Sequence, residues 1–92
     1  MRTQAEIEAE IKALEACKKY VPHFTAFGED NRAYLSTQID ALNGAIDETA
    51  AEFEELTERE RDAYQEAIDW KNGDSDDVPS AGWDNYKNKA KK

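Results

Sequence analysis

The sequence has few of the residues on which cross-linked, metal-bound or catalytic small domains depend. A single cysteine in 92 residues cannot form an internal disulfide, which fits a reducing compartment, so we expect a cytoplasmic protein. One cysteine and one histidine cannot supply the four ligands of a zinc site. The four glycines are scattered and form no phosphate-binding loop, and no apolar run is long enough to span a bilayer.

Candidate catalytic groups are equally sparse. His23 lies beside Phe24 in an expected connection, and Cys17 falls on the apolar face of an expected helix, where a buried inert thiol is the usual outcome. Acid–base catalysis needs two carboxylates that burial has made different, whereas the acids here lie on helix faces that we expect to be exposed to water. We therefore expect a protein that is not an enzyme and that binds no cofactor.

One segment imitates a calcium-binding loop. Asn72, Asp74 and Asp76 occupy the first, third and fifth positions of such a loop. The sixth position, which should be glycine, is Asp77, and the twelfth, which should be glutamate, is Trp83. Since both defining positions are wrong, we predict no metal site.

Negative charge is what the sequence has in excess. It carries 21 acidic and 12 basic side chains, a net charge of −9. Residues 29–77 hold sixteen acids and four bases, whereas residues 1–28 are neutral and the last ten residues carry a net +3. Because phosphate contacts require Lys and Arg together on one face, we do not expect the body of the protein to bind nucleic acid directly.

The spacing of apolar residues predicts a first helix. Thr3 and Glu6 form its capping box, and it should end near Tyr20 because Pro22 restricts the residue before it. Steps of three and four place five apolar residues on one face of this helix: Ile7, Ile11, Leu14, Cys17 and Val21.

A longer heptad pattern follows. We interpret Gly28 to Asn31 as a turn and an N-cap, after which apolar positions recur at Leu35, Ile39, Leu42, Ile46, Thr49 or Ala50, Phe53 and Leu56. Because the phase passes unbroken through Asn43-Gly44, it favours one continuous helix, with a turn at Gly44 as the alternative. The pattern fails at Glu60, so we predict a helical break near Thr57.

A third helix starts from a second capping box at Thr57 and Glu60 and should end at Asn72-Gly73. Its apolar face consists of Ala63, Tyr64, Ala67, Ile68 and Trp70. Farther along, Trp83 and Tyr86 should pack back onto the helices, since two large aromatic side chains are costly to leave in water.

These elements predict an all-α fold: an antiparallel helical hairpin, a third helix and a short C-terminal tail. Residues 1–72 would form the helical domain, and residues 73–92 an acidic loop and a lysine-bearing tail. The first helix is shorter than the second, so the hairpin leaves part of the heptad seam uncovered. The third helix or a second copy of the chain must cover it, and a monomer and a homodimer both remain open.

One stretch resembles a known family. The run Thr25 to Asn31 (TAFGEDN), followed by Gln38-Ile39 and Leu42, resembles an uncharacterised family of small helical proteins of phages and mobile elements that share an A-F-G-[DE]-D-N … Q-I-x-x-L motif. The similarity covers residues 5–45 and a looser echo at 70–73 and 79–83, whereas the acidic helix downstream departs from the family. No activity is known for that family, so the resemblance implies only a genomic setting.

An acidic surface is the remaining feature. Acids recur at steps near three or four between residues 48 and 69, interrupted by Arg59. We predict that seven of them bind a partner, and we call them the acidic stripe: Glu48, Glu52, Glu55, Glu58, Asp62, Glu66 and Asp69. One interpretation is a solvated face that keeps a small protein soluble. The other is a surface that imitates the regularly spaced charges of a nucleic acid and occupies a partner's basic groove.

We therefore expect a non-enzymatic binding protein whose acidic stripe engages the basic, nucleic-acid-binding surface of a host protein, with no membrane partner. Its most concrete form is a phage or mobile-element inhibitor. The alternative is a small structural or assembly protein that acts through homo-oligomeric helix–helix contacts, its acids serving only solubility. Salt separates the two, because screening weakens an electrostatic contact and spares an apolar interface.

Overall fold

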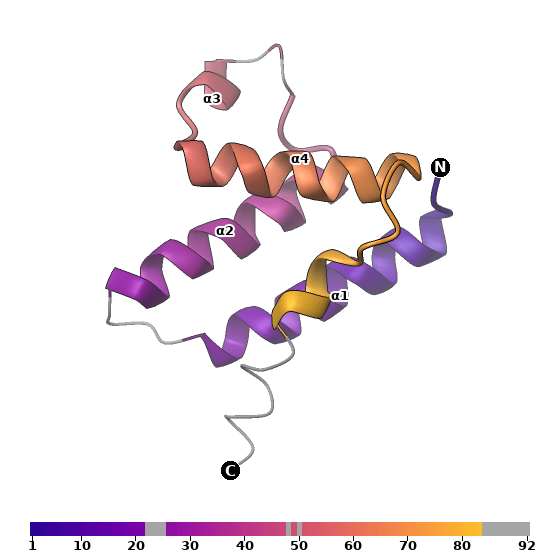
Figure 1. Cartoon of the computed structure of the whole chain (residues 1–92), viewed down its shortest axis with the longest axis horizontal. Coiled ribbons are helices and arrows are strands. Elements are labelled where there is room, and N and C mark those ends of the chain that lie inside the picture. Colours follow the sequence, from indigo (N-terminus) through magenta and orange to yellow (C-terminus); the bar gives the residue numbers. More distant parts are fainter. Residues whose placement is uncertain (22–25, 48, 50, 84–92) are drawn as a thin grey trace.

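The computed structural model describes residues 1–21, 26–47, 49 and 51–83, and these contain helices and no strand (Figure 1). The α-helices are α1 (Gln4–Tyr20), α2 (Ala26–Asn43), α3 (Ala51–Glu54) and α4 (Glu58–Asn72), followed by a 3₁₀ turn, η1 (Pro79–Trp83). α1 and α2 run in opposite directions, and α2 packs against both α1 and α4 (Figure 1). The predicted all-α fold, a helical hairpin with a third helix and a short tail, is confirmed.

α1 has the predicted ends and the predicted buried face. The Thr3 hydroxyl accepts a hydrogen bond from the Glu6 amide at 3.2 Å, and the Glu6 carboxylate accepts one from the Thr3 amide at 3.4 Å. Val21, the residue before a proline, is extended and ends the helix. The apolar stripe of α1 is buried at Ile7, Leu14, Cys17 and Val21 and half-buried at Ile11.

Both predicted ends of α2 are wrong. The helix begins at Ala26, so Gly28 to Asn31 are helical and form no N-cap. Asn31 is buried, and its side-chain oxygen accepts a hydrogen bond from Arg59 of α4 at 2.6 Å, a tertiary role that no local pattern encodes.

The continuous helix through Asn43-Gly44 is also wrong, and the alternative that we had kept open is correct. Gly44 has φ +74°, its amide donates to the Ala41 carbonyl, and the Ala45 amide donates to the Asp40 carbonyl. These two bonds are those of a Schellman motif, which ends a helix at a left-handed residue. The chain therefore turns away from α2 at Gly44, and the heptad seam is split between α2 and the segment that follows.

Gly44→Ala is expected to lower the free energy of unfolding by about 1 kcal/mol, because an L-residue is strained at positive φ. A Cβ at Gly44 would meet nothing within 4 Å, so backbone conformation alone accounts for the cost. Gly82→Ala is the matched control: its Cβ also meets nothing, and its φ is not positive. Denaturant unfolding that gave both variants the same stability would contradict this account.

The predicted break near Thr57 is confirmed. Thr57 is the N-cap of α4 in a complete capping box with Glu60, and Gly73 ends the helix with φ +86°. On α3, which precedes the break, Phe53 packs edge-on against Tyr64 with ring centroids 5.1 Å apart. The apolar residues after Gly44 thus fold back onto the core, with Ile46 and Phe53 partly buried against it.

The core lies between α1, α2 and α4, and η1 covers one side of it. Trp83 is 8% exposed, so its predicted packing against the helices is confirmed, whereas Tyr86 lies outside the described residues. η1 packs against both α1 and α4. At this contact the Ser80 amide donates to the buried carboxylate of Glu10, on α1, at 2.9 Å.

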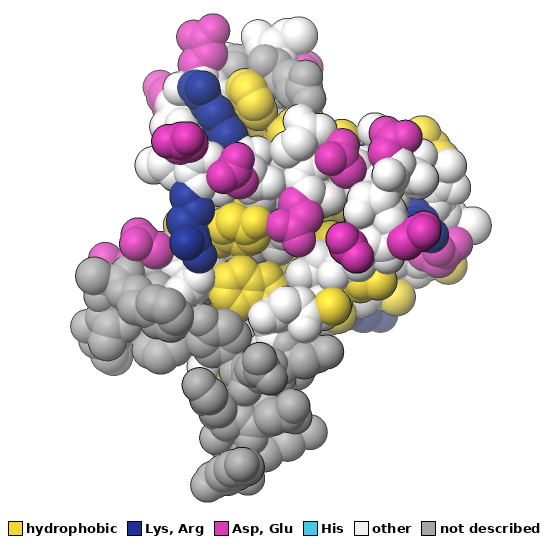
Figure 2. Space-filling view, in the orientation of Figure 1, with side chains coloured by type: hydrophobic (Ala, Val, Ile, Leu, Met, Phe, Trp, Pro, Cys, Tyr) yellow, Lys and Arg dark blue, Asp and Glu magenta, His cyan; other side chains and the backbone are white. Residues whose placement is uncertain are grey.

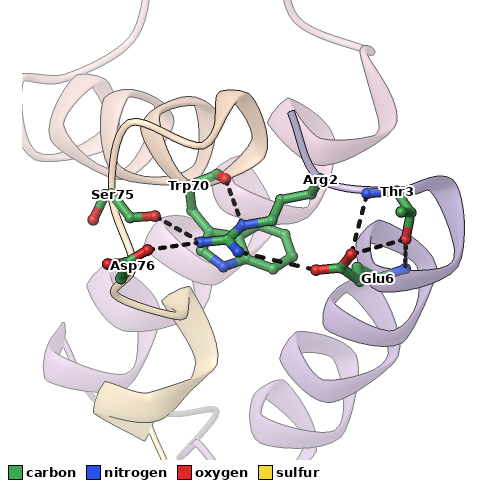
Figure 3. Close-up of polar contacts among 6 residues, drawn as sticks. All are labelled: Arg2, Thr3, Glu6, Trp70, Ser75 and Asp76. Carbon is green, nitrogen blue, oxygen red and sulfur yellow. Dashed lines mark hydrogen bonds and ion pairs between the residues drawn. The ribbon is translucent and has the colours of Figure 1, made fainter.

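Arg2 joins the start of the chain to the end of α4 (Figure 3). Its guanidinium donates to the Trp70 carbonyl at 3.1 Å and to the Ser75 carbonyl at 3.0 Å, and it lies 5.2 Å from the centroid of the Trp70 ring. The same group forms ion pairs with Glu6 and Asp76. Because carbonyl, carboxylate and ring all face one cation, Arg2 fixes α1 against the C-terminal end of α4.

Candidate functional site

The structure divides the acidic stripe into two groups. Glu58, Asp62, Glu66 and Asp69 follow one another along α4 at steps of four, four and three, so their side chains share one face of a single helix. Glu52 lies on α3 and Glu55 just after it, both exposed, and the non-helical Thr57 separates them from α4. Glu48 lies outside the described residues. The stripe is therefore not one continuous helical row.

The α4 group faces solvent. Glu58, Asp62 and Glu66 are exposed and Asp69 is half-buried. Figure 2 shows acidic side chains gathered over α4 on the face turned toward the viewer, with hydrophobic side chains and a few basic ones between them.

The arginines nearest to these acids form no ion pair with them. Arg59 places its guanidinium 5.1 Å from the centroid of the Tyr34 ring and donates to Asn31, whereas Arg61 lies over Phe53 and donates to the Glu54 carbonyl at 2.8 Å. The ion pairs among the described residues all involve Arg2. Within the part of the chain that the structure describes, no Lys or Arg forms an ion pair with the acids of the α4 face.

Glu66 is held by Tyr34 of α2. The Tyr34 hydroxyl donates to Glu66 Oε2 at 2.6 Å, a short, charge-assisted hydrogen bond. Burial raises the pKa of the Tyr34 hydroxyl well above its ordinary value, and the hydrogen bond to Glu66 raises it further. The phenol therefore stays protonated and keeps this carboxylate at a fixed position on the surface.

A hollow of about 360 Å³ opens beside this pair, where α2, α4 and η1 meet. Tyr34 and Trp83 form its aromatic wall, with ring centroids 5.7 Å apart and planes tilted by 54°. We call it the aromatic hollow and define it by its lining residues: Tyr34, Arg59, Asp62, Glu66, Pro79, Gly82 and Trp83. Two acids of the stripe thus lie on the edge of a pocket.

A second hollow, of about 420 Å³, has the opposite charge. It lies between the end of α1 and α2, and its lining includes Lys18, Lys19 and Arg32 together with Glu15 and Ile39. Arg32 donates to the Lys18 carbonyl at 2.8 Å, which satisfies one of the open carbonyls at the end of α1. Arg32 thus has a structural role at this helix end, and the basic lining lies on different elements from the acidic stripe.

Sequence reasoning missed Tyr34 and Arg59 as members of the site. In the sequence, Tyr34 only adjoins Leu35 of the heptad seam, and Arg59 only interrupts the acidic pattern. Trp83 was predicted to pack but not to line a pocket. The sequence does show an aromatic residue in the second helix and acids in the third. Whether they meet depends on how α2 and α4 cross, which the sequence does not reveal.

The described part of the chain shows no group of three or more Cys, His, Asp or Glu side chains placed to hold a metal ion. Within the same residues, no helix combines the length and the apolar character needed to cross a membrane. Comparison with known protein families, with curated proteins and with solved structures finds no match.

Proposed function

We propose that this protein is a non-enzymatic binding protein whose acidic α4 face engages a basic surface of a partner protein. The observation that carries the proposal is that four acids share one exposed helix face while the neighbouring arginines are bonded elsewhere in the chain. Regularly spaced, uncompensated carboxylates are complementary to a Lys- and Arg-lined groove, including one that holds a nucleic acid.

The resemblance to small phage and mobile-element proteins gives this proposal its most concrete form. An inhibitor of a host nucleic-acid-binding protein would act in the cytoplasm and would compete with nucleic acid for the same cations. The charge pattern of the acidic stripe supports that role, and the genomic setting is the part contributed by the resemblance.

The assembly alternative requires a heptad seam that is open to a second copy of the chain. Leu35 and Leu42 of the heptad seam are buried in the chain's own core, so these residues do not form an exposed seam for a second copy. Among the described residues, the exposed large apolar side chains are Met1, Tyr20 and Val78. We therefore favour the electrostatic binding surface.

Reversing four stripe acids to lysine, at Glu52, Glu55, Glu58 and Asp69, is expected to abolish capture of basic host proteins by the immobilised protein at low salt. Each attraction becomes a repulsion, whereas exposed charges contribute only about 0–1 kcal/mol each to folding. Asp69, the half-buried member, accepts an exposed hydrogen bond from Gln65 one turn earlier on α4. Circular dichroism checks the fold. Capture by the parent protein should also fall steeply as ionic strength rises.

The matched control reverses four exposed acids outside the stripe: Glu8, Glu15, Asp40 and Asp77. Glu10 and Glu66 are left intact in both variants because each accepts a hydrogen bond that supports the fold. If the stripe variant captured the same proteins as the parent, or if the control lost them equally, the acids would be solvation only.

A further inference from the structure

We propose that the chain has a second, dimeric form, in which α2 continues through Gly44 as one long helix and α4 packs on α2 of a second copy of the chain. The heptad pattern continues in phase across Gly44, although the structure turns there. The closed chain exposes no seam, so the second copy is admitted only when the chain opens at Gly44. This inference is independent of the proposed function, because the acidic α4 face is present in both forms.

The turn at Gly44 rests on local backbone interactions. Gly44 has φ +74°, a conformation that glycine adopts at little cost. Its amide donates to the Ala41 carbonyl at 3.2 Å, and the Ala45 amide donates to the Asp40 carbonyl at 2.9 Å. A Cβ at Gly44 would meet nothing within 4 Å, so packing does not hold this position in place. In a continuous helix the same amides donate to carbonyls four residues earlier, so opening the turn costs few hydrogen bonds.

The segment after the turn has a composition that favours a helix. Eight of the twelve residues from 45 to 56 are Ala, Glu or Leu, which are strong helix formers. In the described part of this segment, only Ala51–Glu54 are helical, and none of these four residues is buried. A continuous helix would use the helix-forming tendency that the closed chain leaves unused.

Two such helices fit side by side in opposite directions. The heptad positions are symmetric about Gly44, at distances of two, five and nine residues: Leu42 and Ile46, Ile39 and Thr49, Leu35 and Phe53. Antiparallel helices that cross at Gly44 therefore place each of these side chains opposite its counterpart in the second copy. Glycine at the crossing point lets the two backbones approach closely.

This arrangement places α4 on the second copy. In the structure, α4 lies beside α2 and runs in the same direction (Figure 1). Thirteen helical residues from 44 to 56 would instead carry the start of α4 about 20 Å beyond the end of α2, where the antiparallel copy places its own α2. Because Thr57 still interrupts the helix, α4 turns back along that α2 in the same relative direction. The contacts between α2 and α4 are thus re-formed between two chains, which is a domain exchange.

Position 44 allows a test with two variants that differ only in chirality. Gly44→Ala strains the left-handed turn and favours the continuous helix, whereas D-alanine at this position, introduced by chemical synthesis, favours the turn. We expect Gly44→Ala to lower the dissociation constant of the dimer about a hundredfold and the D-alanine protein to stay monomeric. Sedimentation equilibrium from about 1 μM to about 1 mM measures both. Circular dichroism should show more helix in the dimer, and the stability of monomeric Gly44→Ala is measured at the lowest concentrations.

Isotope-filtered NMR separates domain exchange from simple association. In the structure, the guanidinium of Arg59 on α4 lies 5.1 Å from the centroid of the Tyr34 ring on α2. In a Gly44→Ala dimer refolded from a mixture of labelled and unlabelled chains, we expect NOEs between Tyr34 of one chain and Arg59 of the other. An association of closed chains keeps this contact within each chain.

Three results would each overturn the exchanged dimer. They are a Gly44→Ala protein that is still monomeric at about 1 mM, a D-alanine protein that dimerises equally well, and a dimer without NOEs between Tyr34 and Arg59 of different chains. Gly82→Ala adds a methyl group at a glycine without positive φ, so it should associate no more than the parent protein. The charge-reversal experiment leaves Gly44 intact, so its outcome decides the proposed function separately.

Discussion

Replacing Gln38 with methionine is expected to raise the free energy of unfolding by about 1–3 kcal/mol. Gln38 is 0% exposed, and neither its amide nitrogen nor its amide oxygen has a hydrogen-bond partner in the described part of the chain. A buried, unpaired amide loses its bonds to water without replacement. Methionine fills a similar volume without that penalty and is flexible enough to fit between Leu35 and Leu42 on the same face of α2.

Thermal and denaturant unfolding measure this effect. For a domain of this size, each kcal/mol shifts the melting temperature by roughly 4–8 °C. Gln65→Met is the control, because Gln65 is exposed on α4 and its change should stay within about 0.5 kcal/mol. A less stable Gln38→Met protein would contradict the prediction and would show that the amide is hydrogen-bonded in solution, for example to a buried water.

Trp83→Ala is expected to lower the free energy of unfolding by about 3–5 kcal/mol, the usual cost of removing a buried tryptophan. Small domains have only about 5–15 kcal/mol in total, so much of the variant would be unfolded at moderate temperature. The indole is 8% exposed and contacts Tyr34, and η1 covers part of α1. Circular dichroism during heating measures the loss.

Val78→Ala is the control for this variant, because Val78 lies five residues earlier and is 40% exposed. Its effect should stay within about 0.5 kcal/mol. If Trp83→Ala melted like Val78→Ala, η1 would contribute nothing to the core, and the aromatic hollow would lose its wall.

The sequence predicts well those features that depend on nearby residues. Both capping boxes, at Thr3 and Thr57, form as expected, because each needs only a hydroxyl and a carboxylate three residues apart. The apolar stripe of α1 is buried for the same reason, since its spacing alone sets one face of a helix.

The two Asn-Gly pairs show where a local helix-stop signal conflicts with the spacing of apolar residues. The pair occurs at residues 43–44 and 72–73, and in both places the glycine adopts positive φ and ends a helix. We predicted the second stop and kept the first only as an alternative, because the heptad phase continues beyond Gly44. The apolar positions after Gly44 do pack on the core, as Ile46 and Phe53 show. They belong, however, to a segment that is separate from α2.

Contacts between distant residues could not be predicted from the sequence. Glu10 looks like one more acid on an amphipathic helix, yet it is buried because the Ser80 amide, seventy residues later, donates to it. The aromatic hollow depends in the same way on the crossing of α2, α4 and η1. Three of its seven lining residues have no binding role in the sequence prediction: Pro79 and Gly82 belong to the predicted loop, and Arg59 interrupts the acidic pattern.

The hydrogen bonds of Arg2 and Glu10 also bear on the order in which contacts form during folding. They join residues separated by 68, 73 and 70 positions, so they close nearly the whole chain into a loop, and such contacts form late and slowly. During synthesis, α1 and α2 emerge before η1, so the hydrogen bond from the Ser80 amide to the Glu10 carboxylate forms after both helices are made. A product that stops before residue 79 leaves the side of α1 under η1 uncovered.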